Sequence, residues 1–483
     1  MSVSILPHEM LACILGYLPM RDLATVSLLC RTWRDLAFKH LYAYVHISRA
    51  SHLASLASRV ASHNGHGPRS IAAHLKRFRI DNLRSTSHES DVLVYESLVH
   101  LELLVPCLAK LRYLEWDAWF AYDAKYLKLF QTHCQSLKGV ELIITNLWPA
   151  KSDQFKLCFN FSNLSHISIT LPGITFMSAE HSSGYLPPLT QLLTACPGLV
   201  SLTLKNMPPC PISVVNIVSS LGSNFVFSDL LIFRIHWISE KYQPVGDNIN
   251  WSNFFSPPHS DSHRLRSFFL RHKGIEDLAL GWSCGTSYEE RIDPNEIVLL
   301  FPSLKRFEGP AFLCNAITKS DIAQNLEVLT IVDPFMENTD WLDTMGGELR
   351  SMPKLRSLII RAHGEDDILD PLVLDNFISA APGIETLECR PAVHDFVAVL
   401  IAISHAPKLR KLVAYGPSWV ASALDQEFIE ISAGEDWINM ISRVAKRCHS
   451  LESFENVNGW IGDLCWQIVR DESGKYQSVI NVG

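Results

Sequence analysis

Residues 355–360 read Leu-Arg-Ser-Leu-Ile-Ile, with apolar residues at the first, fourth and sixth positions. The same six-residue template occurs at 199–204, 326–331 and 384–389. Thirteen stretches of the 483-residue chain start such a template, at residues 75, 111, 137, 164, 199, 230, 275, 304, 326, 355, 384, 409 and 451. Apolar residues that alternate with variable ones are typical of a strand with one buried face. We therefore expect one short strand in each template.

The spacing of the templates predicts a repeat. Seven of the twelve intervals between starts measure 22 to 29 residues, within the range of about 20–29 of leucine-rich repeats. Amphipathic runs that end in a turn precede many templates, as at 126–133 and 375–381. Helices that alternate with strands favour an α/β fold with parallel strands. Residues 46–465 are thus predicted to form an irregular leucine-rich-repeat solenoid, with parallel strands inside and helices outside.

One further template match and one alternative fold compete with this interpretation as a repeat. Residues 265–270 also fit the template, but they lie ten residues before the start at 275, so we expect a helix there. A doubly wound domain would need a glycine-rich phosphate loop early in the chain, and the sequence contains none.

The ends of the repeat need caps. A strand is predicted at 44–48, and residues 466–483 read as a C-terminal hairpin because Asp-Glu-Ser-Gly separates two apolar stretches. Gly, Pro, Asn and Ser dominate residues 240–262, which predicts a long surface insertion.

Residues 1–45 carry two apolar helical stripes. The first is Met10, Leu11, Ile14, Leu15 and Leu18, opened by Pro7 and stopped by Pro19. The second follows Asp22 as its cap and comprises Leu23, Val26, Leu29, Cys30 and Trp33, with a break near Arg31. A module near 40 residues usually needs a metal, disulfides or a partner for stability. The stripes therefore serve either a partner helix or the rest of the chain.

The stretches 6–11 (LPHEML), 14–18 (ILGYL), 21–23 (RDL) and 26–37 (VSLLCRTWRDLA) resemble an F-box. This resemblance implies docking on a Skp adaptor, which links an F-box protein to the cullin and RING subunits of a ubiquitin ligase. Matched by position, the implied adaptor contacts are Leu6, Pro7, Leu11, Ile14, Leu15, Leu18, Leu23, Val26, Cys30, Trp33 and Leu36.

The composition of the chain limits the kinds of binding partner and the cellular location that we expect. The chain has 42 basic and 50 acidic residues, a net charge of −8, which argues against nucleic acid as a partner. Its apolar runs fall short of the about 20 residues that a spanning helix needs, and no signal peptide is recognisable. We therefore expect no membrane partner and a cytoplasmic or nuclear location. The twelve cysteines contain no CxxC pair, so we expect no metal, cofactor or disulfide framework.

A target-binding surface is predicted from tryptophans. Six of them follow a template end within six residues, more than chance placement of twelve would give; they are Trp119, Trp148, Trp237, Trp282, Trp419 and Trp460. Tryptophan is enriched at binding hot spots, although rings at strand ends also serve as covers for the core. We predict that these six form a target-binding rim.

The strand positions that we expect on the concave side of the repeat carry both signs of charge, which favours a protein ligand over a polyanion. They are Arg77, Arg79, Glu115, Glu141, Arg234, Arg306, Glu308, Arg361, Glu388, Arg390 and Lys411.

One catalytic motif occurs. Residues 281–285 (GWSCG) match the GxSxG nucleophile elbow with Ser283, but residues 286–296 supply no apolar helix face behind it. We therefore expect a protein without catalytic activity of its own.

The predicted function is the substrate-recognition subunit of a Skp–cullin–F-box ubiquitin ligase, which holds a target protein on the repeat. The alternative is a leucine-rich-repeat interaction scaffold without a part in ubiquitination.

Overall fold

The computed structural model describes residues 7–62, 70–81, 97–118, 124–144, 156–171, 185–206, 213–237, 249, 251–255, 263–280, 292–333, 349–362, 369–389, 396–415, 435–457 and 464–482. The chain divides by its internal packing into two units, residues 1–230 and 231–483, and each is described by itself. Among the described residues, none of the helices combines the length and the apolar character that a membrane crossing requires.

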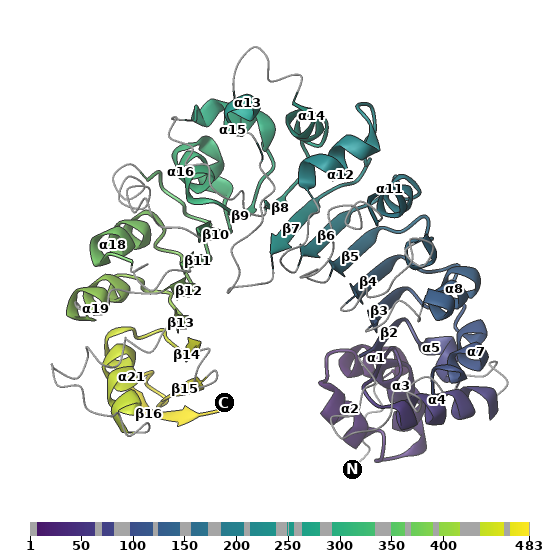
Figure 1. Ribbon diagram of the computed structural model, residues 1–483. Helices are drawn as coiled ribbons and strands as arrows, with labels where there is room; N and C mark the ends of the chain where they lie inside the picture. Colours follow the sequence, from purple (N-terminus) through teal and green to yellow (C-terminus); the bar gives the residue numbers. More distant parts are fainter. Residues whose placement is uncertain are drawn as a thin grey trace. The chain divides into compact units, whose positions relative to one another are not determined.

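Unit 1 begins with three short helices, α1 (His8–Leu15), α2 (Met20–Val26) and α3 (Arg31–Leu41) (Figure 1). Helix α1 starts directly after Pro7 and α2 directly after Pro19, where the fixed φ of proline favours helix entry. The prediction that Asp22 caps the second helix was wrong, because Pro19 already starts it and Asp22 lies in its first turn. The predicted break is confirmed: α3 starts at Arg31, after an extended Cys30.

The repeats of unit 1 follow these helices. Six parallel strands pair in sequence order: β1 (Tyr44–Ile47), β2 (Arg77–Ile80), β3 (Tyr113–Ala118), β4 (Gly139–Ile144), β5 (His166–Leu171) and β6 (Ser201–Asn206). The connecting segments contain α4 (Ala50–Ser62), α5 (Ile71–His74), α7 (His100–Leu104), η1 (Val105–Cys107), α8 (Ala124–His133), α11 (Leu186–Thr194) and α12 (Val214–Leu221). These helices lie on one face of the strands (Figure 1).

Unit 2 continues the same alternation. Its parallel strands are β7 (Ile232–Trp237), β8 (Asp277–Ala279), β9 (Arg306–Gly309), β10 (Val328–Asp333), β11 (Ser357–Ala362), β12 (Thr386–Cys389), β13 (Lys411–Tyr415) and β14 (Ser453–Val457). Its helices are α13 (Trp251–Phe255), α14 (Arg264–Arg271), α15 (Pro294–Leu300), α16 (Ala311–Lys319), η5 (Asp321–Asn325), α18 (Pro371–Ala380), α19 (Phe396–Ser404) and α21 (Glu435–Arg447). Helix α14 covers 265–270, so the helix predicted there is confirmed.

The templates predict the residue at which each strand begins. Each strand from β2 to β14 starts two residues after a predicted template start. The first and fourth template positions are buried in all thirteen, as Leu355 and Leu358 illustrate. These side chains pack toward the helices, and each strand pairs in parallel with the preceding one in its own unit. The predicted α/β fold class, short N-terminal helices followed by a repeat of parallel strands and helices, is confirmed.

The surface insertion predicted at 240–262 needs correction. Ile249 and helix α13 are described within it, and Ile249, Trp251 and Phe254 are buried. The Trp251 ring lies 5.3 Å from that of Phe312, on α16. Aromatic burial draws this part of the insertion into the core, because rings of this size contribute large apolar areas. The remainder of 240–262 lies outside the described residues.

An antiparallel hairpin, β15 (Leu464–Arg470) and β16 (Tyr476–Asn481), follows β14. Arg470 anchors it, because its Nη2 donates to the carbonyls of Ala445, Cys448 and Leu451 at 3.1, 2.8 and 3.1 Å. A cation at the C-terminal end of a helix also complements the helix dipole. The hairpin is thus fixed to the end of α21, where a C-terminal cap was predicted. The domain boundaries themselves stay predictions.

Candidate functional site

The first three helices have a small core of their own. Leu15, Leu23 and Ala37 are buried at its centre, one from each helix. The partly buried side chains around them are Leu18, Val26, Trp33, Leu36 and Leu41. The core uses only one side of α1, although that helix is apolar almost all round.

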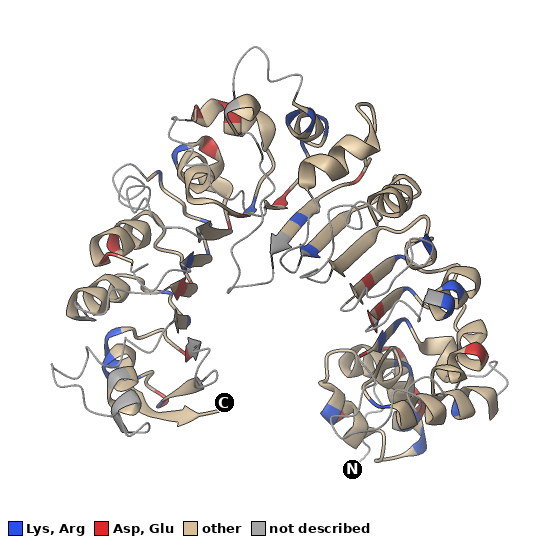
Figure 2. Ribbon diagram, in the orientation of Figure 1, with Lys and Arg blue, Asp and Glu red and all other residues tan. Residues whose placement is uncertain are grey.

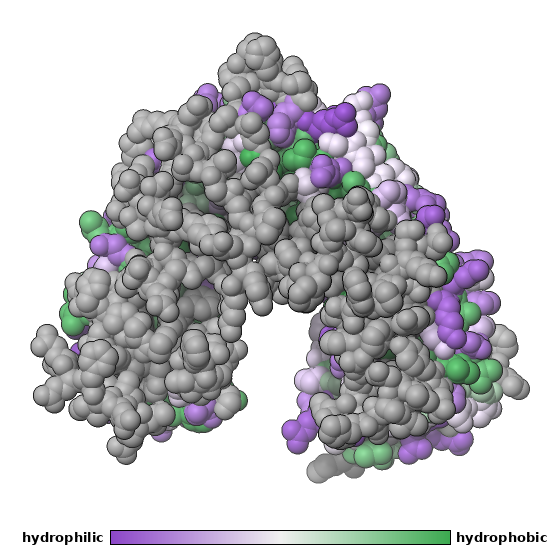
Figure 3. All heavy atoms as spheres, viewed as in Figure 1, coloured by the Kyte–Doolittle hydropathy of each residue, from purple (hydrophilic) through white to green (hydrophobic). Residues whose placement is uncertain are grey.

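The other side of α1 is open. Met10, Ile14 and Tyr17 lie at helical spacing in and just after α1, and Tyr17 is 86% exposed. Between α2 and α3, Leu28 and Leu29 are 76% and 69% exposed. We call Met10, Ile14, Tyr17, Met20, Leu28 and Leu29 the outer face. Hydrophobic surface is visible at the lower edge of this N-terminal part in Figure 3. Large exposed apolar side chains gathered in one small module mark an interaction site.

The predicted adaptor contacts divide into groups. Pro7, Ile14 and Cys30 are exposed, while Leu11, Leu18, Val26, Trp33 and Leu36 are half-buried. Their contact with an adaptor stays a prediction, and Leu6 lies outside the described residues. The prediction that Leu15 and Leu23 contact an adaptor needs correction, because side chains buried in the module's own core are not accessible to a partner.

Sequence reasoning missed most of the outer face. The list of adaptor contacts omitted Met10, Tyr17, Met20, Leu28 and Leu29. The signal for two of them was present, since Met10 and Tyr17 share the helical spacing of Ile14. Leu29 was predicted on the second helical stripe, but α2 ends at Val26, so Leu28 and Leu29 lie outside a helix and only the structure reveals their exposure.

The module also contacts the repeats, through α3 and the segment that follows it. The ring of Phe38, in α3, lies 5.9 Å from that of His74, in α5. The carbonyl of Ala43 accepts from the backbone N–H groups of Lys76 and Arg77, both at 2.9 Å, where β1 joins β2. The module therefore caps the repeats on one side and leaves the outer face open on the other. Of the two uses left open by the stripes, the structure shows contact with the rest of the chain and leaves apolar surface open for a partner.

His40 joins α3 to the end of α1. Its ring lies close to Gly16, where an added Cβ would come within 3.3 Å of the ring carbon Cε1. The buried Nε2 has no hydrogen-bond partner in the part of the chain that the structure describes. Burial, followed by the charge of Lys39, lowers the pKa of His40 below its usual 6.5, outweighing a hydrogen bond with the backbone of Ala12. The folded module thus favours the neutral imidazole.

We expect acid to loosen this module through His40. Because the pKa is lowered in the folded state, the unfolded chain takes up the proton first, and stability falls as the pH drops below 6.5. The opening free energy of the α1 and α3 amides, measured by hydrogen exchange and corrected for intrinsic rates, should decline from about pH 7.5 to about pH 5.5. His40→Gln should flatten the decline, and His8→Gln, at an exposed position of α1, should leave it unchanged. An equal decline in the His40 variant would contradict this assignment.

The tryptophan rim cannot be placed. Trp119, Trp148, Trp282, Trp419 and Trp460 lie outside the described residues, as do Ser283 and Arg390. Trp237 is the last residue of β7, and its side chain is not described. The rim stays a prediction.

Comparisons with known proteins add three findings. Residues 3–48 match the model of the family described as F-box-like. A search of curated proteins found no match. Among solved structures, the crystal structure of the Rad7 and Elc1 complex in yeast contains a similar chain, with 14% sequence identity and a TM-score of 0.40; the match covers 86% of this chain and 94% of that one. Residues 3–48 are therefore an F-box-like domain, and the parallel strands and helices of the repeats follow it.

Proposed function

We propose that this chain is the substrate-recognition subunit of a Skp–cullin–F-box ubiquitin ligase. The F-box-like domain docks on a Skp adaptor, and the repeats hold a target protein. The observation that carries the proposal is the outer face of the F-box-like domain, because it stays open although the domain has its own core and is fixed to the repeats. A domain that served only as a cap would have no need of this apolar surface.

The mechanism is proximity. With the adaptor on one part of the chain and the target on another, target lysines meet the ubiquitin-charged enzyme at high effective concentration. The chemistry then belongs to other subunits of the ligase. This assignment places the protein in the cytoplasm or the nucleus, where such ligases work.

Co-expression with a Skp adaptor tests the proposal. We expect the full chain and the adaptor to elute as one complex, and the complex to bind a cullin with its RING subunit. Proximity labelling of the full chain and of a chain without its first 45 residues should then recover the same targets, while ligase subunits vanish with the deletion. Failure of the full chain to bind any Skp adaptor would favour the interaction scaffold.

A further inference from the structure

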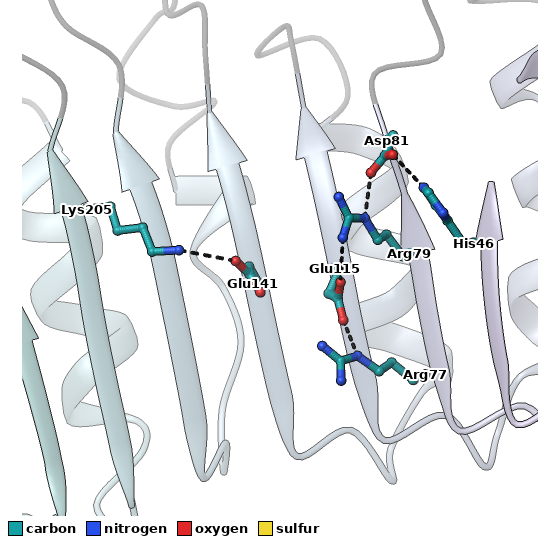
Figure 4. Close-up of polar contacts among 7 residues, drawn as sticks. All are labelled: His46, Arg77, Arg79, Asp81, Glu115, Glu141 and Lys205. Carbon is teal, nitrogen blue, oxygen red and sulfur yellow. Dashed lines mark hydrogen bonds and ion pairs between the residues drawn. The ribbon is translucent and has the colours of Figure 1, made fainter. Parts of the chain in front are cut away.

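The strands of unit 1 have a second face, opposite to the helices. Residues two, four and six positions after a template start lie on it, because the first, fourth and sixth template positions pack toward the helices; His46, on β1, is the register partner of Arg79. We call His46, Arg77, Arg79, Asp81, Tyr113, Glu115, Glu141 and Lys205 the open face. Figure 2 shows both signs of charge along these strands, and Figure 4 shows how most of the open-face side chains pair.

Ion pairs connect neighbouring strands across the open face. Glu115, on β3, accepts a hydrogen bond from Nε of Arg77 and pairs with Nη1 of Arg79 at 3.7 Å. Nε of Arg79 donates to Asp81 at 2.6 Å, and Asp81 also contacts His46. The cations and carboxylates hold one another in fixed positions (Figure 4), so the charges are organised before any ligand arrives.

The two signs of charge lie at different depths. The side chain of Arg77 is 55% exposed, whereas its partner Glu115 is 11% exposed. Arg79 is likewise more exposed than Asp81. In unit 2, the side chain of Arg361 is likewise more exposed than that of its partner Glu388. A partner that approaches the open face of unit 1 therefore meets guanidinium groups first, and the carboxylates lie beneath them.

Arg77 offers a free end to this partner. Its Nε is engaged by Glu115, and its guanidinium lies 5.6 Å from the centre of the Tyr44 ring. Its two terminal nitrogens make no hydrogen bond or ion pair among the described residues. Two parallel N–H groups on a planar guanidinium match the two oxygens of a carboxylate. The contacts at Nε and at the ring reduce the entropy lost when such a ligand binds.

Tyr113 supplies a flat surface on the strand next to that of Arg77. It is the register partner of Arg77 across β2 and β3. Its ring lies over Gly139, where an added Cβ would approach ring carbon Cδ1 to 2.4 Å, and it meets the ring of His166 edge-on at 5.8 Å. Glycine at 139 is thus what allows the ring to lie across β4. A partly exposed aromatic surface on one strand and a guanidinium on the neighbouring strand suit an extended peptide, which brings backbone and side chains to both.

We propose that the open face of unit 1 binds an extended, carboxylate-bearing segment of the target protein, with one carboxylate on the terminal nitrogens of Arg77 and the peptide across Tyr113. The description of this ligand as a ubiquitination target rests on the proposed function; the binding chemistry does not. Carboxylate is favoured over phosphate because the carboxylates of the open face balance its arginines and lysine, leaving no excess positive field for a dianion.

A synthetic peptide provides the test. The probe is an alternating Glu-Ser peptide of about ten residues, long enough to cross several strands at about 3.3 Å per residue. Its controls are the matching Gln-Ser peptide and a phosphoserine version of that control. Binding of each labelled peptide to the full chain is measured by fluorescence anisotropy at low salt, and thermal unfolding is recorded for every variant.

We expect the Glu-Ser peptide to bind more tightly than the Gln-Ser peptide. Arg77→Gln should weaken binding roughly tenfold, about 1.4 kcal/mol. Arg77→Lys should recover part of the affinity, because it restores the charge without the planar pair of donors. Lys128→Gln removes the same charge from the helix layer, on α8, and should change nothing. Equal binding by Arg77→Gln, no preference for Glu-Ser, or binding of the phosphoserine peptide alone would each overturn the proposal.

Capture of a Skp adaptor by the same proteins separates the two proposals. If Arg77→Gln captures the adaptor but binds the Glu-Ser peptide as the unchanged chain does, only the carboxylate site fails. If the unchanged chain binds the Glu-Ser peptide through Arg77 but captures no adaptor, the ligase assignment fails and the site belongs to an interaction scaffold.

Discussion

Ile14→Asp combined with Tyr17→Asp is expected to abolish capture of a Skp adaptor while the F-box-like domain stays folded. Both residues belong to the outer face and are substantially exposed, so the aspartates remain solvated in the free chain. In a complex, the same carboxylates would be buried against an apolar partner without a counter-charge. We expect the adaptor affinity to fall about 100-fold or more, as for the loss of interface hot spots. Affinity measured with the purified adaptor, beside circular dichroism, checks both parts.

The controls for this experiment come from the same unit. Leu103→Asp, on α7, places a carboxylate at another exposed leucine and should leave adaptor binding unchanged. Leu15→Asp is unsuitable as a docking variant, because it puts a charge into the module's core and unfolds it. Unchanged capture by the folded Ile14 and Tyr17 double variant would show that the outer face is not the docking surface.

The second large effect is expected from Leu358→Ala in the centre of unit 2. Leu358 is fully buried, and its register partners Leu329 and Leu387 on the flanking strands are buried too. Removal of most of its side chain leaves a cavity that rigid neighbouring strands cannot fill, at a cost of about 2–5 kcal/mol. The opening free energy of the β10, β11 and β12 amides in native-state hydrogen exchange should fall by that amount.

Ile359→Ala is the matched control in the same strand. Ile359 lies one residue further along β11, on the opposite face, and is only half-buried. Its truncation removes less buried apolar area and should cost less than about 1.5 kcal/mol. Equal losses in the two variants would contradict a core that lies on one side of the strands.

The strands could be predicted because each needs only local information. The apolar residues at the first, fourth and sixth template positions are close in sequence and identify the buried face of one strand, so all thirteen starts lie two residues before an observed strand. Short-range order also located the helix at 265–270, since an extra strand would leave no room for a crossover before 275. These features follow from the two-residue period of a strand and from the length of the connections.

The F-box-like helices were recognisable for the same reason, but the choice of their working face was not. Helix α1 and the turn after it are apolar almost all round, with Leu15 buried and Ile14 and Tyr17 exposed. Periodicity shows that an apolar stripe exists and leaves open which side packs inward when both sides qualify. The contacts of Leu15 with α2 and α3 decide that question, and they exist only in the folded module.

The chain's sequence alone determined the strand positions, the helix–strand alternation and the presence of an F-box-like segment, because each depends on residues a few positions apart. The tertiary structure decided which apolar side chains stay open, that Trp251 turns into the core, and that Nε of Arg77 pairs with the less exposed Glu115. Arg77 and Glu115 are 38 residues apart in sequence. Contacts of that kind join side chains of different strands, so they form only when β2 and β3 lie side by side in the folded chain.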